Sequence, residues 1–419
     1  MKALICIPCL LTGGTEIQTL NTVHALVQGG HQVTVACYFE HTPDMVARYR
    51  KAGAEVILFS PEGVRVGGYK SILFLYRHLR RAIRMVRPDV VHVQYMAPGA
   101  TVILLLWLIG VKNIIATAHT AADIYKDLRL IHFLQRYCLR AWTCITERAE
   151  RSFFGTSQLY TPETVLGRRN HFTIYNALPA QMRCNDNDNV DDNCAAELLC
   201  SNDNVDDNEN FCSQLTAHRS QSQFSSSLSS SSQKDPKAPF VLGVVSRLEP
   251  IKGMDLVVPA LAEVLKVHPD TQLLVVGDGS LRASMEQQAV ELGCADHIRW
   301  VGRQPQEELP QWYGQMDIVL MPSRSEGFGL TAIEAMACGC VVVASDTGGL
   351  PEVVRDGICG LLHRTEDVTD MASKISALIS DTALYAQLRA QSLQEVEKYS
   401  FERYAALMND LYKRLVFRV

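Results

Sequence analysis

Two glutamates are eight residues apart in the stretch SEGFGLTAIEAMACG, which covers residues 325–339. Glu326 lies just before the turn Gly327–Gly329, and Glu334 lies one turn into a helical pattern that begins near Leu330. A helix start leaves backbone N–H groups without partners and carries the positive end of the helix dipole, so it accommodates a phosphate. Carboxylates accept hydrogen bonds from sugar hydroxyls on both oxygens. The stretch therefore predicts a binding site for a phosphate flanked by two hydroxylated groups, as in a nucleotide sugar.

A second pair of charged residues supports this interpretation. Arg247 and Lys252 occur in the segment GVVSRLEPIKG, where the strand pattern Phe240–Val245 gives way to a helical one. Two cations suit a leaving group that becomes more negative when its bond breaks. Each motif has a plainer alternative, namely two solvated glutamates on an amphipathic helix and two surface cations at a strand end. Because both motifs occur in one chain, we favour the functional interpretation.

Two features of the N-terminal half are candidates for contact with the same ligand. Gly13 and Gly14, in LTGGTE, lie between a strand pattern and a helical one, so their backbone can come close to a phosphate. His119, in IIATAHT, lies at the carboxyl end of a strand, where open α/β sheets place residues that contact ligands. The alternatives are an ordinary turn for the glycines and a packing or capping role for the histidine.

The segment from Glu326 to Glu334 resembles the Glu-x7-Glu signature of retaining glycosyltransferases with the GT-B architecture, in particular glycosyltransferase family four (group 1). Arg247 and Lys252 resemble the Arg-x4-Lys pair with which that family holds the donor diphosphate. The resemblance implies that Glu326 contacts the donor sugar, that Glu334 contacts the nucleotide ribose, and that His119 lies close to the reacting sugar. The catalytic residues that it implies are Arg247, Lys252, Glu326 and His119.

The resemblance also implies a donor site and an activity. Besides Glu334, the implied donor-binding residues are Gly13, Gly14, Gly277, Arg303, Ser323, Gly327, Phe328, Gly329 and Leu330. The activity is transfer of a hexose, with retention at the anomeric carbon, from a nucleotide-diphosphate sugar to a glycan or lipid-linked acceptor in the synthesis of cell-surface polysaccharide or glycolipid. No metal and no cofactor beyond this co-substrate is implied. Two alternatives stay open: a nucleotide-sugar epimerase of the same architecture, and a catalytically silent nucleotide-sugar-binding protein.

The chain has 419 residues, enough for two or three domains, and strand patterns alternate with helical ones in both halves. This alternation indicates parallel strands with helices on both faces. With the resemblance, it predicts an α/β fold of GT-B architecture, in which two Rossmann-like domains face a cleft and are joined by a low-complexity insert. The expected strands are Ala3–Ile7, Gln32–Cys37, Glu55–Phe59, Val90–Val93, Ile114–Ala118, Thr143–Thr146, Phe172–Tyr175, Phe240–Val245, Gln272–Val276, Ile298–Val301, Ile318–Leu320, Val341–Ala344 and Gly360–Leu362.

Four segments are expected along the chain. Residues 1–180 form an N-terminal acceptor domain, residues 239–398 form a nucleotide-sugar donor domain, and residues 399–419 form a C-terminal helix that could pack back on the first domain. Residues 181–238 form a linker rich in Asn, Asp and Ser, which contains NDNVDDN twice and too few apolar residues to offset the entropy of ordering. Calcium binding is the weaker alternative, because the glycine and the bidentate glutamate of an EF-hand loop are missing.

Charge is unevenly distributed. Residues 1–180 carry 20 lysines and arginines against 11 acidic residues, whereas residues 239–419 carry 16 against 24. A basic first half suggests an anionic partner there. The helical pattern Tyr76–Arg87 is rich in arginine and suggests peripheral contact with a membrane surface through Arg77–Arg87. A solvated basic face is an equal alternative, and no nucleic-acid-binding motif accompanies the charge.

The remaining composition is typical of a cytoplasmic protein. The apolar run Thr101–Ile109 is too short to cross a bilayer and predicts a buried helix. The first residues fit a strand and its loop better than an export signal. The 13 cysteines are scattered and odd in number, so we expect reduced thiols and no zinc site. We therefore expect a cytoplasmic location, with peripheral contact to the inner face of the membrane as an option.

Overall fold

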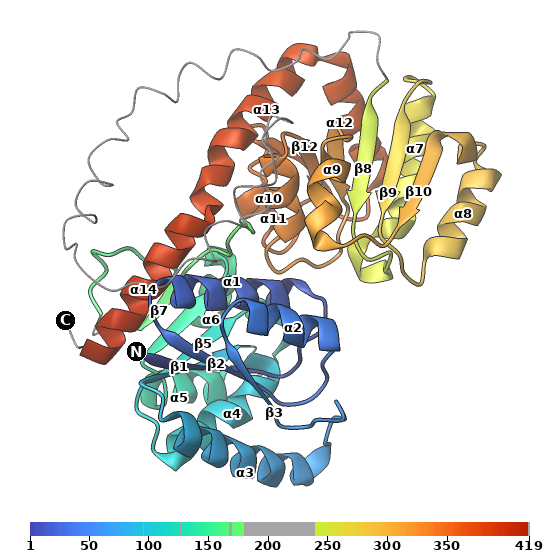
Figure 1. Ribbon diagram of the computed structural model, residues 1–419. Helices are drawn as coiled ribbons and strands as arrows, with labels where there is room; N and C mark the ends of the chain where they lie inside the picture. Colours follow the sequence, from blue (N-terminus) through green and yellow to red (C-terminus); the bar gives the residue numbers. More distant parts are fainter. Residues whose placement is uncertain (95, 126, 167–169, 180–238, 418–419) are drawn as a thin grey trace, which may run out of the picture. The chain divides into compact units, whose positions relative to one another are not determined.

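The computed structural model of the protein describes residues 1–94, 96–125, 127–166, 170–179 and 239–417 (Figure 1). The linker expected over residues 181–238 lies outside these described residues. Within them the chain forms two parallel sheets, one from strands that precede the insert in the sequence and one from strands that follow it.

The first sheet has seven strands in the order β3-β2-β1-β4-β5-β6-β7. They are β1 (Lys2–Ile7), β2 (Gln32–Cys37), β3 (Glu55–Leu58), β4 (Val90–Gln94), β5 (Ile114–Ala118), β6 (Ala141–Cys144) and β7 (His171–Thr173). The register places Ile5 of β1 between Val35 of β2 and His92 of β4. Since the strand order reverses between β1 and β4, the carboxyl ends of these two strands flank the place where open α/β sheets bind ligands.

Helices cover both faces of this sheet (Figure 1). They are α1 (Gly14–Gln28), α2 (Pro43–Lys51), α3 (Gly68–Val86), α4 (Met96–Ile109), α5 (Arg129–Tyr137) and α6 (Glu147–Phe154). Apolar side chains of α1 and α2 pack into one core cluster, and those of α3, α4, α5 and α6 pack into a second cluster on the opposite face. Helices on both faces explain why the inner strands read as almost continuous apolar runs. No helix in the described ranges is long and apolar enough to cross a membrane.

The second sheet has six parallel strands in the order β10-β9-β8-β11-β12-β13. They are β8 (Val241–Val245), β9 (Gln272–Val276), β10 (Ile298–Gly302), β11 (Ile318–Met321), β12 (Val341–Ser345) and β13 (Gly360–His363). The order reverses between β8 and β11, so this sheet has its own switch point. Two parallel sheets with helices on both faces confirm the predicted α/β architecture of two Rossmann-like domains.

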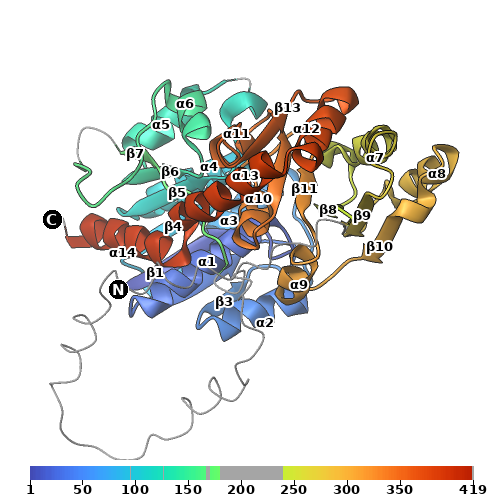
Figure 2. The ribbon, with the colours of Figure 1, turned by 90° about the horizontal axis from the view of Figure 1, so that it is seen from above.

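The helices of the second domain divide between the two faces of its sheet, as Figure 2 shows. They are α7 (Val257–Leu265), α8 (Arg282–Glu291), α9 (Leu309–Tyr313), α10 (Leu330–Ala337), α11 (Leu350–Val353), α12 (Val368–Ser380) and α13 (Thr382–Glu395). Side chains of α7, α8 and α12 enter one core cluster, whereas those of α9, α10 and α11 enter the other. Helix α10 begins near Leu330, where the sequence predicts a helix start.

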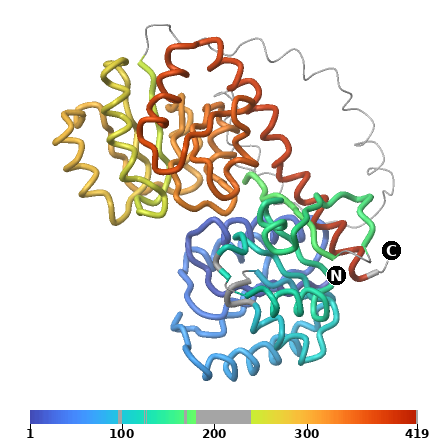
Figure 3. The backbone as a smooth tube through the Cα atoms, turned by 180° about the vertical axis from the view of Figure 1, so that it is seen from behind, coloured from blue at the N-terminus to red at the C-terminus, as the bar shows by residue number. Residues whose placement is uncertain are grey.

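The last helix, α14 (Phe401–Phe417), packs on α1 of the first domain (Figures 1 and 3). The Tyr404 hydroxyl lies 2.6 Å from Oγ1 of Thr22, and the Tyr160 hydroxyl donates to Asp410 at 2.6 Å. The residues that α14 buries recur at helical spacing: Tyr404, Met408, Leu411, Tyr412 and Leu415. Residues that follow the second sheet therefore complete a core of the first domain.

Two expectations about element ends need correction. The strand expected over Thr143–Thr146 is β6, which begins and ends two residues earlier, because the Thr146 side chain accepts a hydrogen bond from the backbone N–H of Ala149 at 3.1 Å and caps α6. Arg87 was expected on the arginine-rich helix. Its φ of 50° instead places it in the left-handed region, where it ends α3 after Val86.

Candidate active site

The switch point of the second sheet brings two predicted catalytic residues into contact. Lys252 follows β8 on a short 3-10 turn, and Glu326 follows β11 just before α10. Lys252 Nζ donates to Glu326 Oε2 at 2.7 Å, and the Ser323 hydroxyl donates to the same oxygen at 3.4 Å. The Lys252 and Glu326 side chains are 22% and 15% exposed, so the pair is shielded yet still reached by solvent. A phosphate that binds here can therefore pair with Lys252 in place of Glu326. Glu326 is then available to accept hydrogen bonds from hydroxyls.

Close backbone contacts hold the loop that carries Glu326. A Cβ on Gly253 would lie 1.9 Å from the Pro322 carbonyl oxygen, and a Cβ on Gly348 would lie 1.8 Å from the Glu326 carbonyl oxygen. Both glycines have positive φ, so only glycine fits these positions. The N–H of Gly349 also donates to the Glu326 carbonyl at 3.0 Å. The loops after β8, β11 and β12 thus pack tightly against one another and fix where Glu326 lies.

Glu334 is buried on the inner side of α10, with only 6% of its surface exposed. The Tyr313 hydroxyl of α9 donates to Glu334 Oε2 at 3.0 Å. Burial raises the pKa of Glu334 to about 7, because the charged carboxylate loses its hydration. The plainer alternative of two solvated glutamates is therefore wrong: Glu334 lies in the core, and Glu326 is held in an ion pair.

Arg324, which precedes Glu326 in the loop, is held by two carboxylates. Its guanidinium donates to both oxygens of Asp255 at 2.7 and 2.8 Å, and it donates to Glu366 at 2.6 Å. These bonds raise the pKa of Arg324 further above its usual range. Its neighbour Ser323 is buried, and the Ser323 carbonyl accepts a hydrogen bond from the Ser345 hydroxyl. Arg324 therefore ties the Glu326 loop to the turn after β8.

The turn that precedes α10 contains one core residue and leads directly into the start of the helix. The Phe328 ring is buried and packs against the rings of Tyr175 and Tyr399, with centroids 6.2 and 5.6 Å away. That ring is thus a core residue, and only the backbone at this position could meet a ligand. Gly329 precedes Leu330 with a φ of 104°, which positions the first N–H groups of α10.

Other predicted donor residues lie at neighbouring strand ends. A Cβ on Gly277, after β9, would lie 1.8 Å from the Ser246 carbonyl oxygen, so the loops after β8 and β9 are adjacent. The Arg247 side chain follows Ser246 and is exposed. Arg303, after β10, is also exposed. Neither arginine side chain packs into the core, so both are accessible to an anion.

The first domain contributes the predicted glycines and histidine at its own strand ends. Gly13 caps α1, and a Cβ on Gly14 would lie 3.3 Å from Cδ1 of Leu330, the first residue of α10. A Cβ on Gly327 would lie 2.5 Å from the carbonyl oxygen of His119. The structure therefore brings the glycine loop and His119 to the start of α10, beside the Glu326 loop.

His119 is buried, and its Nε2 lies 2.8 Å from Oε1 of Gln94. Burial lowers the pKa of His119 to about 3, so the ring is neutral at physiological pH. A small internal pocket beside His119 is lined by Gln18, Gln94, Thr117, Asn176 and Tyr404, among others. The sequence interpretation did not name Gln94. Gln94 lies at the carboxyl end of β4, beside the switch point, and a strand-end position of the same kind was the reason for naming His119.

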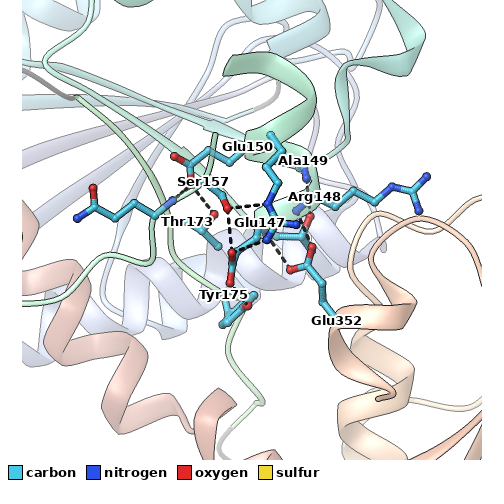
Figure 4. A network of polar contacts seen from close by, with 11 residues as sticks. Glu147, Arg148, Ala149, Glu150, Ser157, Thr173, Tyr175 and Glu352 are labelled. Atoms are coloured by element: carbon cyan, nitrogen blue, oxygen red, sulfur yellow. Dashed lines mark hydrogen bonds and ion pairs between the residues drawn. The ribbon is translucent and has the colours of Figure 1, made fainter. Parts of the chain in front are cut away.

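A further contact, which the sequence did not predict, joins α11 to α6 (Figure 4). Glu352 of α11 accepts hydrogen bonds from the backbone N–H groups of Glu147 at 2.8 Å and Arg148 at 2.5 Å. The Arg148 side chain donates to the Gly348 carbonyl at 3.1 Å. A carboxylate at a helix N-terminus satisfies unpaired N–H groups and meets the positive end of the dipole. Because Gly348 packs on Glu326, this contact links α6 to the loop that carries Glu326.

Two family models match the chain. The model described as Glycosyltransferase Family 4 covers residues 12–156, and the model described as Glycosyl transferases group 1 covers residues 227–395. The D-inositol 3-phosphate glycosyltransferase of Corynebacterium jeikeium (strain K411) is 37% identical over 182 residues, which are 42% of this chain and 43% of that protein. The protein of the same name from Nocardia farcinica (strain IFM 10152) is 40% identical over 34% of this chain and 33% of that protein. The chain thus matches less than half the length of these curated relatives.

Solved structures share the fold over nearly the whole chain. A glycosyltransferase from Rickettsia africae ESF-5 superposes with a TM-score of 0.73 at 17% identity, covering 100% of this chain and 99% of that one. Anabaena Alr3699/HepE in complex with UDP and glucose superposes with a TM-score of 0.67 at 18% identity, covering 97% of each chain. Identities this low concern the fold alone. With family models on both halves and this two-domain fold, the chain belongs to the group 1 glycosyltransferases of the GT-B architecture, glycosyltransferase family four.

Proposed function

We propose that the protein transfers a hexose from a nucleotide-diphosphate sugar to an acceptor, with retention at the anomeric carbon. The observation that carries this proposal is the Lys252–Glu326 ion pair of 2.7 Å at the switch point of the second sheet, beside the start of α10. When the donor binds, Lys252 and Arg247 hold its diphosphate. Glu326 then accepts hydrogen bonds from the donor sugar, and Glu334 accepts them from the ribose.

The proposed reaction balances without a protein nucleophile. The bond between the anomeric carbon and the diphosphate breaks, and its electron pair leaves on the diphosphate oxygen. The acceptor oxygen forms its bond to that carbon from the same face, and its proton passes to the departing diphosphate. Arg247 and Lys252 stabilise the negative charge that grows on the leaving group, and the N–H groups that begin α10 add to this stabilisation. His119 orients hydroxyls close to the reacting carbon.

Two rival functions share these binding contacts. A nucleotide-sugar epimerase would alter the donor when no acceptor is present, and a silent binding protein would bind the donor without any turnover. We favour transfer because Arg247, Lys252, Glu326 and Glu334 are all present, and because the described site offers no assigned acid–base set for epimerisation.

Donor turnover and donor binding can be measured together. UDP-, GDP- and ADP-sugars are screened for hydrolysis and for a rise in melting temperature, starting with UDP-glucose because the Anabaena structure contains UDP and glucose. Acceptors to test include glycans, lipid-linked sugars and D-inositol 3-phosphate, which the curated relatives carry in their names. Product NMR should show a retained anomeric configuration, and inversion would contradict the proposed mechanism.

We also propose that neither a metal ion nor another cofactor takes part. The positive charges that face the diphosphate are then Arg247, Lys252 and the start of α10. EDTA should leave most of the activity in place. Loss of activity in EDTA, with recovery when Mn²⁺ is added, would contradict this proposal.

The outer surface of α3, α4 and α5 supports a peripheral contact with the membrane. These three helices contain no Asp or Glu, and they pack side by side on one face of the first sheet. Their exposed large apolar side chains are Tyr69, Ile72, Leu73, Met85, Trp107, Leu108, Leu130, Phe133 and Tyr137. Their exposed basic side chains are Lys70, Arg77, Arg80, Arg81, Arg84, Arg129 and Arg136. Apolar and aromatic groups among cations suit an anionic lipid surface, which we propose to be the inner face of the cytoplasmic membrane.

Vesicle binding tests this surface. The protein should co-sediment with phosphatidylglycerol vesicles, and less with phosphatidylcholine vesicles. The triple variant Arg80→Glu/Arg81→Glu/Arg84→Glu should lose this binding, whereas Arg403→Glu, an exposed position on α14, should keep it. Equal binding by the triple variant and the wild type would show that the basic face is merely solvated.

A further inference from the structure

The Arg324 guanidinium makes all its hydrogen bonds within the second domain. Its Nε and Nη2 donate to the two oxygens of Glu366 at 2.6 and 3.2 Å. Its Nη1 and Nη2 donate to the two oxygens of Asp255 at 2.7 and 2.8 Å, and Nη1 also donates to the Pro250 carbonyl. A guanidinium has five N–H groups, one on Nε and two on each Nη, and no acceptor. These bonds therefore use all of them, and Arg324 has none left for a ligand.

The bonds of Arg324 hold the turn that carries Lys252 from both sides. Pro250 lies two residues before Lys252, and Asp255 lies three residues after it. The backbone N–H of Arg324 also donates to the Ile251 carbonyl at 3.0 Å. Three consecutive positions of contact fix this turn against the loop after β11, to which Arg324 itself belongs.

The two carboxylates that Arg324 binds differ in exposure. The Glu366 side chain is 57% exposed, whereas the side chains of Asp255 and Arg324 are 42% and 26% exposed. Glu366 also has a φ of 67°, in the left-handed region that non-glycine residues adopt only where other contacts hold them. Hydrogen bonds from Arg324 lower the pKa of Asp255, so this carboxylate is charged at neutral pH. Since solvent weakens the more exposed pair more, we expect the bond to Asp255 to matter most.

Two ionic contacts thus join the loop after β8 to the loop after β11. One is the Lys252–Glu326 pair at 2.7 Å, and the other is the Arg324–Asp255 pair. On the proposed function, the first contact opens when the diphosphate of the nucleotide sugar pairs with Lys252. The second contact uses no group that binds a ligand, so it can persist throughout the reaction.

We propose that Arg324 is a positioning residue, which through Asp255 holds the turn of Lys252 and the loop of Glu326 in place when their own ion pair opens. The consequence for turnover rests on the proposed sugar transfer, whereas the hold on the turn does not. Arg324 acts through Lys252 and Glu326 and does not touch the substrate.

The competing interpretation is that Arg324 serves only as a further positive charge near the diphosphate. The variant Arg324→Lys separates the two interpretations. A lysine keeps the charge, but its single ammonium nitrogen cannot bridge two carboxylates and a carbonyl in the planar geometry of a guanidinium. Positioning therefore predicts a loss in Arg324→Lys, and charge alone predicts none.

Acetylation of the free, full-length protein tests the hold without any sugar substrate. The protein is treated briefly with acetic anhydride, and mass spectrometry follows acetylation of Lys252, with Lys266, which is 66% exposed, as the internal reference. In the wild type Lys252 should react more slowly than Lys266, because its amine is paired with Glu326 and is 22% exposed. Arg324→Lys and Asp255→Asn should each raise the rate at Lys252 about 3-fold or more, because a looser turn exposes the amine more often.

A matched control changes another paired arginine of the same domain. Arg355, which precedes β13, pairs with Glu395 at 3.0 Å. Arg355→Lys should leave the acetylation rate of Lys252 and the turnover unchanged.

Kinetics then test the consequence for turnover. Arg324→Lys should lower kcat roughly 10- to 100-fold, because displacing a catalytic group by about 1 Å can cost about 100-fold. The KM for the nucleotide sugar should change less, because the charge that Lys252 stabilises grows in the transition state. The double variant Arg324→Lys/Asp255→Asn should be no slower than Arg324→Lys alone, since both changes remove the same contact. Glu366→Gln, which alters the more exposed contact, should have the smaller effect.

Each other result overturns one proposal or the other. Full turnover in Arg324→Lys but not in Arg324→Gln would show that only the charge matters, and losses that multiply in the double variant would show that Arg324 does not act through Asp255. If Arg324→Lys fails to fold, Asp255→Asn decides: wild-type acetylation of Lys252 together with wild-type kcat overturns the positioning role. The expected acetylation pattern without sugar transfer from any nucleotide sugar would leave the hold on the turn standing and refute the proposed function instead.

Discussion

The carboxyl ends of the two sheets treat charge in opposite ways. At the second sheet the predicted ligand-binding residues are charged: Lys252 and Glu326 are paired at 2.7 Å, and the Arg247 side chain is exposed. At the first sheet the corresponding groups are neutral, since His119 is held without charge by burial and bonded to Gln94. Charges suit a diphosphate, and neutral groups of fixed direction suit hydroxyls. On the proposed function, we expect the second domain to stabilise the leaving group and the first domain to orient the sugar or the acceptor.

The difference in burial explains why the second site can hold charges whereas the first site is neutral. The Lys252 and Glu326 side chains remain partly exposed, so their charges stay hydrated when no ligand is bound. His119 and His92 are almost completely buried, where an isolated positive charge would be strongly disfavoured. The first site thus carries no charge and instead forms a buried hydrogen-bond network.

The largest effect should follow from removing a cation of the second site. Lys252→Ala or Arg247→Ala should lower turnover about 100-fold or more, because loss of one charge-stabilising group typically has this effect. Steady-state kinetics with a saturating donor measure it, and Arg403→Ala on α14 serves as a matched control. Folding should survive, since both residues follow β8 in a loop. Near-normal turnover in either variant would remove that residue from the diphosphate site.

The two buried sites should respond to pH in opposite directions. The folded-state pKa of His119 lies below its ordinary value, so the stability that its burial allows is full above about pH 6.5 and is lost as pH falls toward about 3. The folded-state pKa of Glu334 lies above its ordinary value. Its contribution is therefore full below about pH 4.5 and is lost as pH rises through about 7.

Unfolding in urea at several pH values measures this contrast. Relative to the wild type, Glu334→Gln should become more stable by roughly 2 kcal/mol between about pH 5 and about pH 8, whereas His119→Gln should become more stable by a similar amount as pH falls from about 7 to about 4.5. If the free energy of unfolding varied with pH in the same way in both variants and the wild type, neither buried group would make a large pH-dependent contribution to stability.

Local sequence patterns predicted the strands well but not the contacts between them. Apolar runs located all thirteen described strands to within two residues at each end, because buried parallel strands need continuous apolar segments. The types and spacing of Lys252 and Glu326 predicted a site, yet the bond between their side chains joins residues 74 positions apart. Glu352 and the start of α6 are separated by more than 200 residues. Such contacts depend on strand order, which no local pattern encodes.

A smaller effect should separate binding from chemistry within the second site. Glu334→Ala should weaken the binding of the nucleoside diphosphate about 10-fold while lowering kcat less, because ribose contacts are the same in the ground and transition states. Tyr313→Phe removes the hydroxyl that donates to Glu334 and should weaken binding less. Calorimetry with the nucleoside diphosphate alone measures both variants, and unchanged affinity in Glu334→Ala would refute the ribose contact.

The smallest expected effect concerns the linker between the two domains. Replacing residues 184–234 with a Gly/Ser segment of about 20 residues should change the free energy of unfolding by only about 1 kcal/mol, because the entropy of loop closure varies slowly with length. Each sheet has its own buried core in the described ranges, and the replaced sequence has few apolar residues to add to either. Turnover should therefore stay close to that of the full chain.

The salt dependence of turnover then tests whether this acidic linker interacts with the basic first domain. Residues 181–238 carry 10 acidic residues against 4 basic ones, and the first domain is basic, so the linker could compete weakly with an anionic acceptor. Faster turnover of the shortened protein at low salt only would support that competition. Insolubility or inactivity at low and high salt alike would show that the replaced residues belong to a folded domain, and the boundary between linker and domain would have to move.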